Sequence, residues 1–296
     1  MADDLVKMGY IPLDKSWTMR MGVLDLIKGR DTTVKFIEER LDAVNDDIRS
    51  LYTASVDWNC YNPVHVGESG TLYRFLKFTA WKTGQEKDFV MSGTLKSREL
   101  CDDPAIVNYP LHALGNVDGH YTTQWISAAI INGSAERLER PGYKIHLTYE
   151  AVDHHAYSLA KGKHWVPKYD ETINRQAKSF IDGIRNGSVS FTPRHSEDYC
   201  FARAMDKVSK NEGDFRWPNL KNHETNRLEE MEIMIEKSDQ GMVVDSVDHR
   251  VVQAIAMRQM VRGQDVKVRD RTVVNKSWPE FWKFLDYARD VYRQRK

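Results

Sequence analysis

Apolar residues recur every three or four positions in several stretches of the chain, which is the spacing of an amphipathic helix. One such stretch covers residues 31–52, and a second covers residues 72–81. The apolar stripe of the first stretch comprises Val34, Ile37, Leu41, Val44 and Ile48. The same spacing predicts further helices over residues 171–185, 200–208, 228–235, 251–261 and 280–292. Each helix is expected to bury its stripe in a core.

Short apolar runs alternate with these helices and predict β-strands, because they are bounded by glycine or by polar residues. The runs cover residues 62–66, 86–93 (with Phe89, Val90 and Met91), 188–191, 241–245 and 266–268. Strands that alternate with helices through short connections are typical of α/β architecture. The pattern therefore predicts an α/β fold.

The turn over residues 67–74, Gly-Glu-Ser-Gly-Thr-Leu-Tyr-Arg, joins a predicted strand to a predicted helix. Such a turn leaves backbone N–H groups at a helix N-terminus, where they attract anions. Gly70 has no Cβ, so a ligand can lie directly against the backbone there. Arg74 follows one turn later and can bind phosphate or carboxylate through two parallel hydrogen bonds. An ordinary helix cap with a surface arginine is the alternative interpretation.

Cationic, hydroxyl and amide residues recur at other predicted helix starts. Lys15, Ser16 and Arg20 cluster at one of them, with Ser16 as the expected N-cap. Residues 122–124, Thr-Thr-Gln, precede another. Capping explains each cluster taken alone. Their recurrence at six or more helix starts along the sequence predicts that these ends converge on one anion-binding cleft.

Composition narrows the classes of protein that fit. The chain has 296 residues, 41% of them hydrophobic, which is enough for one large or two ordinary domains. The formal net charge is zero, so we expect no nucleic-acid partner. No apolar run approaches a membrane span, and the three widely spaced cysteines suit a reducing compartment. We therefore expect a cytoplasmic protein with no membrane partner, no metal and no cofactor.

Seven motifs follow one another in the order found in the enolpyruvyl transferases, and the chain resembles this family. They comprise Lys15-Ser16-x-x-x-Arg20, residues 67–75, 93–99, 118–125 and 223–227, Asp248-His249-Arg250, and Asn275-Lys276-Ser277-Trp278-Pro279. Residues 67–75 are similar to the family's Asn-x-Gly-Thr-x-x-Arg loop, and residues 223–227 to its Lys-Glu-x-Asp-Arg segment. The motifs span nearly the whole chain.

The resemblance implies two similar domains, each built of βαβαββ repeats, with the active site between them. The chain is shorter than the usual family members, so we expect about four repeats in place of six. The implied domains are residues 16–145 and residues 1–15 plus 146–296. The protein is expected to act as a monomer.

The resemblance also implies transfer of the enolpyruvyl group of phosphoenolpyruvate to the 5-hydroxyl of shikimate 3-phosphate, with release of phosphate. The implied phosphoenolpyruvate ligands are Lys15, Gly70, Arg98, Gln124, Arg227, Arg250 and Lys276. The implied acceptor ligands are Ser16, Arg20, Thr122, Thr123, Tyr143, Asp198, Asn219 and His223. The implied catalytic residues are Lys15, Asp198, Glu224 and His249. Asp198, helped by Lys15, would take the acceptor proton, and Glu224 would protonate C3 of the donor.

Three departures from the family pattern keep other functions open. Glu68 stands where the family has asparagine, His223 replaces its lysine, and residues 139–143 match its Ser-x-Pro-Tyr segment imperfectly. All three lie on the acceptor side, so an enolpyruvyl transferase with another hydroxyl acceptor is the first alternative. A noncatalytic anion-binding relative is the second. An RNA 3′-phosphate cyclase is a third, although no histidine is singled out for nucleotidylation and the charge is balanced.

Overall fold

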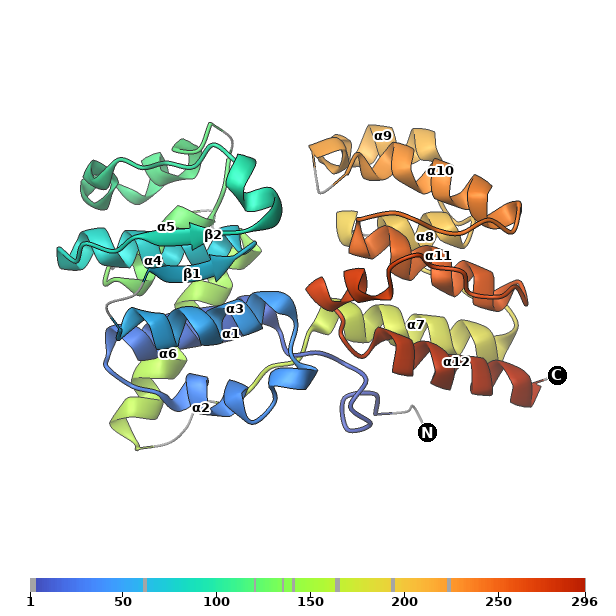
Figure 1. Ribbon diagram of the computed structural model, residues 1–296, viewed down its shortest axis with the longest axis horizontal. Helices are drawn as coiled ribbons and strands as arrows, with labels where there is room; N and C mark the ends of the chain where they lie inside the picture. Colours follow the sequence, from blue (N-terminus) through green and yellow to red (C-terminus); the bar gives the residue numbers. More distant parts are fainter. Residues whose placement is uncertain are drawn as a thin grey trace. The chain divides into compact units, whose positions relative to one another are not determined.

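A computed structural model describes residues 4–60, 63–119, 121–134, 136–139, 142–162, 166–192, 195–222 and 225–295. The chain divides into two compact units (Figure 1). The first unit is Leu13–Lys168, and the second combines Met1–Pro12 with Tyr169–Lys296. The domains implied by the resemblance had their boundaries after residues 15 and 145 instead. The N-terminal segment thus belongs to the same unit as the C-terminal half.

Most of the described chain is helical, and the predicted α/β fold of βαβαββ repeats is wrong. The strands among the described residues are β1 (Val64–Gly67) and β2 (Phe89–Met91), which pair in parallel. Of the run expected as a strand over residues 241–245, Val244 alone makes a bridge, to Val268. The run over residues 188–191 forms no strand. A short apolar run becomes a strand only where a second extended segment lies beside it. The runs over residues 241–245 and 266–268 meet at a single bridge, and the run over residues 188–191 has no paired segment among the described residues.

The described residues of the first unit form six α-helices besides β1 and β2. They are α1 (Lys15–Ile27), α2 (Thr32–Glu38), α3 (Asp46–Trp58), α4 (Gly70–Thr83), α5 (Gln124–Ile131) and α6 (Tyr143–Ala160). Of these, α3 and α4 contact β1. Short 3₁₀ helices, η1 (Leu41–Ala43), η2 (Gly93–Ser97), η3 (Pro104–Asn108) and η4 (Leu111–Asn116), fill connections. The core includes Trp17, Phe75 and Trp125, each at most 1% exposed.

Capping residues decide where these helices begin. The N-cap of α1 is Asp14, whose side chain accepts from Trp17 N, so the expected Ser16 cap is wrong. The predicted helix over residues 31–52 is broken into α2, η1 and α3, because the Asn45 side chain caps a new start by accepting from Ile48 N. Ser69 caps α4 through Leu72 N. The short polar side chains of Asp14 and Asn45 accept from backbone N–H groups that would otherwise have no partner in the first turn of a helix. They therefore favour a new helix start over a helix that continues through these positions.

The second unit stacks its helices in layers, with α9 and α10 above α8 and α11, and these above α7 and α12 (Figure 1). The helices are α7 (Glu171–Asn186), α8 (Tyr199–Ala204), α9 (Lys210–Arg216), α10 (Arg227–Asp239), α11 (His249–Val261) and α12 (Phe281–Arg295). The 3₁₀ helices are η5 (Ser196–Asp198), η6 (Pro218–Asn222) and η7 (Arg271–Lys276). The N-terminal residues Leu5 and Ile11 are buried in its core.

Each unit contains one step in which an extended segment, a helix and a second extended segment follow in parallel. In the first unit, α4 connects β1 to β2, and η2 follows. In the second, α11 connects Val244 to Val268, and η7 follows. Ligands of parallel strand–helix units bind beyond the carboxyl ends of the strands, where the helix begins. The starts of α4 and α11 are therefore the positions where a ligand is expected.

Candidate functional site

Three predicted phosphoenolpyruvate ligands meet at the start of α4. A Cβ built on Gly70 would lie 2.9 Å from Arg74 Nη1 and 3.6 Å from Arg98 Nη1. Arg74 Nη1 in turn donates to Gln124 Oε1 at 2.5 Å. Gly70, Arg98 and Gln124 come from α4, from the residue after η2 and from the start of α5. The first unit therefore assembles one local cluster, which we call the α4 cluster: Gly70, Thr71, Arg74, Arg98 and Gln124.

A buried hydrogen-bond network holds the α4 cluster in place. Arg74 Nε donates to Asp118 Oδ2 at 2.5 Å, and its Nη1 donates to the carbonyl of Gly70 at 3.1 Å. Asp118 Oδ1 accepts from Trp125 Nε1 and from the backbone N–H of Cys101, each at 2.9 Å. Gln124 Nε2 donates to Thr71 Oγ1 at 2.7 Å. The amide of Gln124 is therefore oriented from both ends.

Arg98 gives the α4 cluster an exposed positive charge. Among the described residues its side chain has one hydrogen bond, to Thr94 Oγ1 at 3.4 Å, and no carboxylate partner. The N-terminus of α4 adds the partial positive charge of its first N–H groups. Glu68 lies at the edge, where a Cβ on Gly93 would clash with its carboxylate. The cluster can bind an anion, with Glu68 limiting how much negative charge it accepts.

The other predicted residues of the first unit are dispersed. Lys15 pairs with Asp47 at 2.9 Å. Arg20 is 1% exposed, and its guanidinium donates to Thr148 Oγ1 at 2.7 Å and to the carbonyl of Ser16 at 2.8 Å. Burial lowers the pKa of Arg20 to about 10, partly opposed by Asp14 and Tyr143. Arg20 therefore serves the core, and its guanidinium does not reach the surface.

Three predicted acceptor residues lie near the starts of α5 and α6. Thr122 Oγ1 accepts from the backbone N–H of Gln124 at 3.3 Å, one residue before Thr123, the N-cap of α5. Thr123 is half-buried, and its methyl would lie 3.9 Å from a Cβ on Gly142. Tyr143, the first residue of α6, is 69% exposed. Thr122 and Thr123 lie between Asp118 and Gln124 in the sequence. This places their hydroxyls next to the α4 cluster.

In the second unit, Asp198 and Arg250 are joined through one glutamine. Gln176 Nε2 donates to Asp198 Oδ1 at 2.8 Å, and its Oε1 accepts from Arg250 Nη1 at 3.3 Å. Arg175 makes a two-pronged ion pair with Asp198, at 2.7 and 2.9 Å. Asp198 is fully buried, whereas the Arg175 side chain is 39% exposed. The carboxylate predicted to act as a base is thus already occupied by a guanidinium.

Arg227 and Asp248 form the counterpart of the Arg74–Asp118 pair. Arg227 Nε donates to Asp248 Oδ2 at 2.7 Å, and Asp248 caps α11 by accepting from the backbone N–H of Arg250 at 2.9 Å. His249, 7% exposed, begins α11, and Lys276 ends η7, which packs on α11. Asn219 lies in η6. Asp198, Arg227, His249 and Arg250 therefore gather at the starts of α8, α10 and α11.

Two predicted site residues, His223 and Glu224, lie outside the described residues. The implied catalytic acid therefore has no described geometry. The sequence-based prediction also missed two residues in contact with Asp198, namely Arg175 and Gln176. They stand inside a predicted helix with no motif around them, so no sequence signal singled them out. Asp118, by contrast, stood in one of the seven motifs, although no role was assigned to it.

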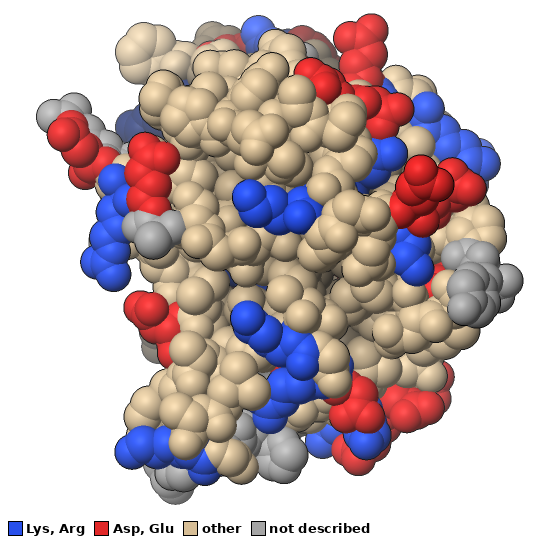
Figure 2. All heavy atoms as spheres, turned by 90° about the vertical axis from the view of Figure 1, so that its left-hand side faces the viewer, with Lys and Arg blue, Asp and Glu red and all other residues tan. Residues whose placement is uncertain are grey.

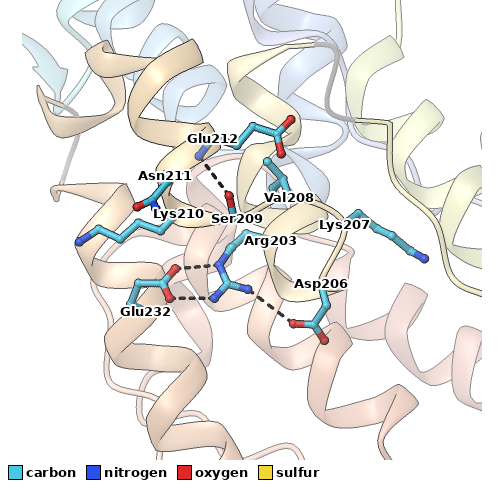
Figure 3. Close-up of a pocket in the computed structure, with 9 residues that line it drawn as sticks. All are labelled: Arg203, Asp206, Lys207, Val208, Ser209, Lys210, Asn211, Glu212 and Glu232. Carbon is cyan, nitrogen blue, oxygen red and sulfur yellow. Dashed lines mark hydrogen bonds and ion pairs between the residues drawn. The ribbon is translucent and has the colours of Figure 1, made fainter.

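A pocket of about 460 Å³ lies elsewhere in the second unit (Figure 3). Its charged lining is largely paired: Arg203 faces Glu232 with two contacts of 2.7 Å, and it also pairs with Asp206. Lys210 pairs with Glu229 at 2.5 Å. None of the predicted site residues that the structure describes lines this pocket. Its charges already neutralise one another, so the pocket does not provide an anion site.

The surface in Figure 2 shows lysine and arginine side chains in small groups among uncharged residues, with acidic side chains gathered beside several of them. Nucleic-acid-binding surfaces instead carry a continuous basic stripe.

Within the described part of the chain, none of the helices has the length and apolar character needed to cross a membrane. No protein-family model, no curated protein and no solved structure matches the chain.

Proposed function

We propose that the protein binds phosphoenolpyruvate and transfers its enolpyruvyl group to a hydroxyl acceptor, as a 3-phosphoshikimate 1-carboxyvinyltransferase does. The observation that carries the proposal is the α4 cluster. Gly70, Arg98 and Gln124 were each assigned to phosphoenolpyruvate from separate motifs, and they meet at the start of one helix.

The chemistry of the α4 cluster suits a small phosphorylated acid. Phosphoenolpyruvate carries a phosphate and a carboxylate, and a planar guanidinium binds either group through parallel hydrogen bonds. Arg98 supplies such a guanidinium, and the α4 N-terminus supplies backbone donors beside Gly70. The amide of Gln124 is held beside them by Arg74 and Thr71.

The proposed reaction is an addition followed by an elimination. The acceptor hydroxyl loses its proton to a base as its oxygen bonds to C2 of phosphoenolpyruvate, and an acid delivers a proton to C3. The tetrahedral intermediate then loses a proton from C3 and expels phosphate, which restores the double bond. The resemblance assigns the base to Asp198 and the acid to Glu224. Asp198 can act as a base only after Arg175 yields one of its two contacts.

A second candidate function, noncatalytic binding of a phosphorylated anion, is favoured by this Arg175–Asp198 pair. A base that is fully buried and occupied by two guanidinium contacts is poorly placed to reach a substrate proton. This function would need the α4 cluster alone.

Calorimetry with phosphoenolpyruvate and a phosphate-release assay test both candidates. Arg98→Ala is expected to weaken phosphoenolpyruvate binding about tenfold or more, because it removes a charged hydrogen-bond donor. Lys96→Ala is the matched control, since it removes an exposed charge from the same segment and should leave the affinity unchanged.

Phosphate release is measured with shikimate 3-phosphate and with a panel of other alcohols. Phosphate release with shikimate 3-phosphate supports the proposed transferase. Phosphate release with another alcohol alone would mean that the transferase uses that alcohol as its acceptor. Binding without release from any acceptor selects the noncatalytic function. Equal affinities of Arg98→Ala, Lys96→Ala and wild type would contradict the site.

A further inference from the structure

We propose that Gln176 is a positioning residue that fixes Asp198 and Arg250 relative to each other, an inference that rests on the proposed function. Gln176 is fully buried in α7. Its Nε2 donates to Asp198 Oδ1 at 2.8 Å and to the carbonyl of Glu197 at 3.1 Å. Its Oε1 accepts from Arg250 Nη1 at 3.3 Å. One side chain therefore links the proposed base to a proposed donor-binding guanidinium.

A neutral amide is the chemical group that this position requires. Its NH₂ end can only donate and suits the carboxylate of Asp198, while its oxygen can only accept and suits the guanidinium of Arg250. The charges on the two sides thus define the orientation of the amide. A glutamate would turn an acceptor toward Asp198, and a leucine would leave both polar partners without this contact.

The neighbouring residues leave the Asp198 carboxylate little freedom. Arg175, one position earlier in α7, occupies both carboxylate oxygens, and Gln176 adds a second donor to Oδ1. The side chain of Asp170 caps α7 through Ile173 N and so fixes the turn that presents both residues. If Arg175 yields to let Asp198 accept a proton, Gln176 still holds Oδ1. The proposed base can then act without moving away from Arg250.

The first experiment compares Gln176→Leu with wild type in calorimetry and in steady-state phosphate release. We expect phosphoenolpyruvate affinity to fall about tenfold, through Arg250, and the turnover number to fall further, through Asp198. Gln259→Leu is the matched control. It is also buried in the second unit, but its amide oxygen accepts from the backbone N–H of Lys267, near the end of α11. It should lower stability and leave affinity and turnover unchanged.

A second variant, Gln176→Glu, tests the role of the amide by its pH profile. The charged groups that face this position are Arg175 on α7, Asp198 of η5 and Arg250 on α11. At neutral pH the new carboxylate would face Asp198 and compete with phosphoenolpyruvate for Arg250. At lower pH the two carboxylates can share a proton and restore a donor to Asp198. Activity of the variant relative to wild type should therefore rise as the pH falls.

The outcomes separate this inference from the proposed function. If wild type binds phosphoenolpyruvate and releases phosphate while Gln176→Leu changes stability alone, as Gln259→Leu does, Gln176 is structural and the inference is overturned. A flat ratio of Gln176→Glu to wild-type activity across pH overturns it equally. If wild type itself neither binds phosphoenolpyruvate nor releases phosphate, the proposed function fails and takes this inference with it.

Discussion

Arg74 Nε lies 2.5 Å from Asp118 Oδ2 in the interior of the first unit, where the two side chains are 4% and 0% exposed. The second unit repeats this relationship between Arg227 and Asp248. Both pairs tie the start of one helix to the segment that leads into another. Each pair fixes the distance between the two helix starts that it joins, and the candidate ligand groups lie at these starts.

Asp118→Asn should destabilise the protein by about 3–5 kcal/mol, because it leaves the buried Arg74 guanidinium without its counter-charge. Urea unfolding measures the loss. Asp102→Asn is the control: its ion pair with Lys77 involves a carboxylate that is 75% exposed, so the loss should stay below about 1 kcal/mol. Equal effects of the two variants would contradict the structural role of the buried pair.

Gly70→Ala should weaken phosphoenolpyruvate binding about tenfold while changing the unfolding free energy by no more than about 1 kcal/mol. The new methyl would lie 2.9 Å from Arg74 Nη1 and must displace it from Gln124. Alanine is the better helix former, which offsets part of the strain. Gly142→Ala, whose Cβ would meet a single atom at 3.9 Å, should bind normally in calorimetry. Unchanged affinity for Gly70→Ala would place the ligand elsewhere.

Glu280→Gln should stabilise the protein by about 1 kcal/mol at pH 7, because Glu280 Oε2 is buried without a hydrogen-bond partner among the described residues. Burial raises the pKa of Glu280 above its ordinary 4.5. The folded state therefore binds the proton more tightly, and wild type loses stability as the pH rises from 4.5 through the folded pKa. Unfolding curves at pH 4 and pH 7 should show the gain at pH 7 only. Glu86→Gln, at an exposed position, should show no gain.

Asp25→Asn should destabilise the protein by about 3 kcal/mol at pH 7, because Asp25 and His155 form a buried pair at 2.8 Å. Burial raises the pKa of Asp25, but hydrogen bonds from His155 and Thr33 outweigh it and lower the pKa below 3.8. Wild type should therefore lose this stability as the pH falls from 3.8 through the folded pKa. The variant should lack this loss in acid unfolding followed by circular dichroism. Asp42→Asn, exposed, should match wild type.

Helices were more predictable from this sequence than strands. The periodic run over residues 72–81 lies within α4, and residues 280–292 nearly coincide with α12, because both carry a continuous apolar stripe. Strand predictions failed at residues 188–191, since four residues carry too little pattern to show whether a partner lies beside them. The expectation of βαβαββ repeats assumed strands of this kind throughout the chain, and it was therefore wrong for the whole fold.

The candidate site was predictable in part for a related reason. Gly70, Arg98 and Gln124 each stand in a motif in which the resemblance implies a phosphoenolpyruvate ligand. Their proximity in space could therefore be expected from the sequence. Gln176 could not, because a buried glutamine inside a helix has no signature until its two charged neighbours arrive from distant segments. Nor could the burial of Arg20 be read from its sequence, since its partner Thr148 lies 128 positions away.

The second unit is discontinuous in sequence, and this bears on the order in which the protein is completed during synthesis. Leu5 and Ile11 are synthesised well before the rest of the core in which they are buried, and the carbonyl of Tyr10 accepts from Trp278 Nε1 at 2.7 Å. The contact of Tyr10 must wait until residue 278 has emerged from the ribosome, whereas Leu13–Lys168 has all its own residues much sooner. Nascent chains stalled midway should therefore hold a folded first unit and an unsatisfied N-terminal segment.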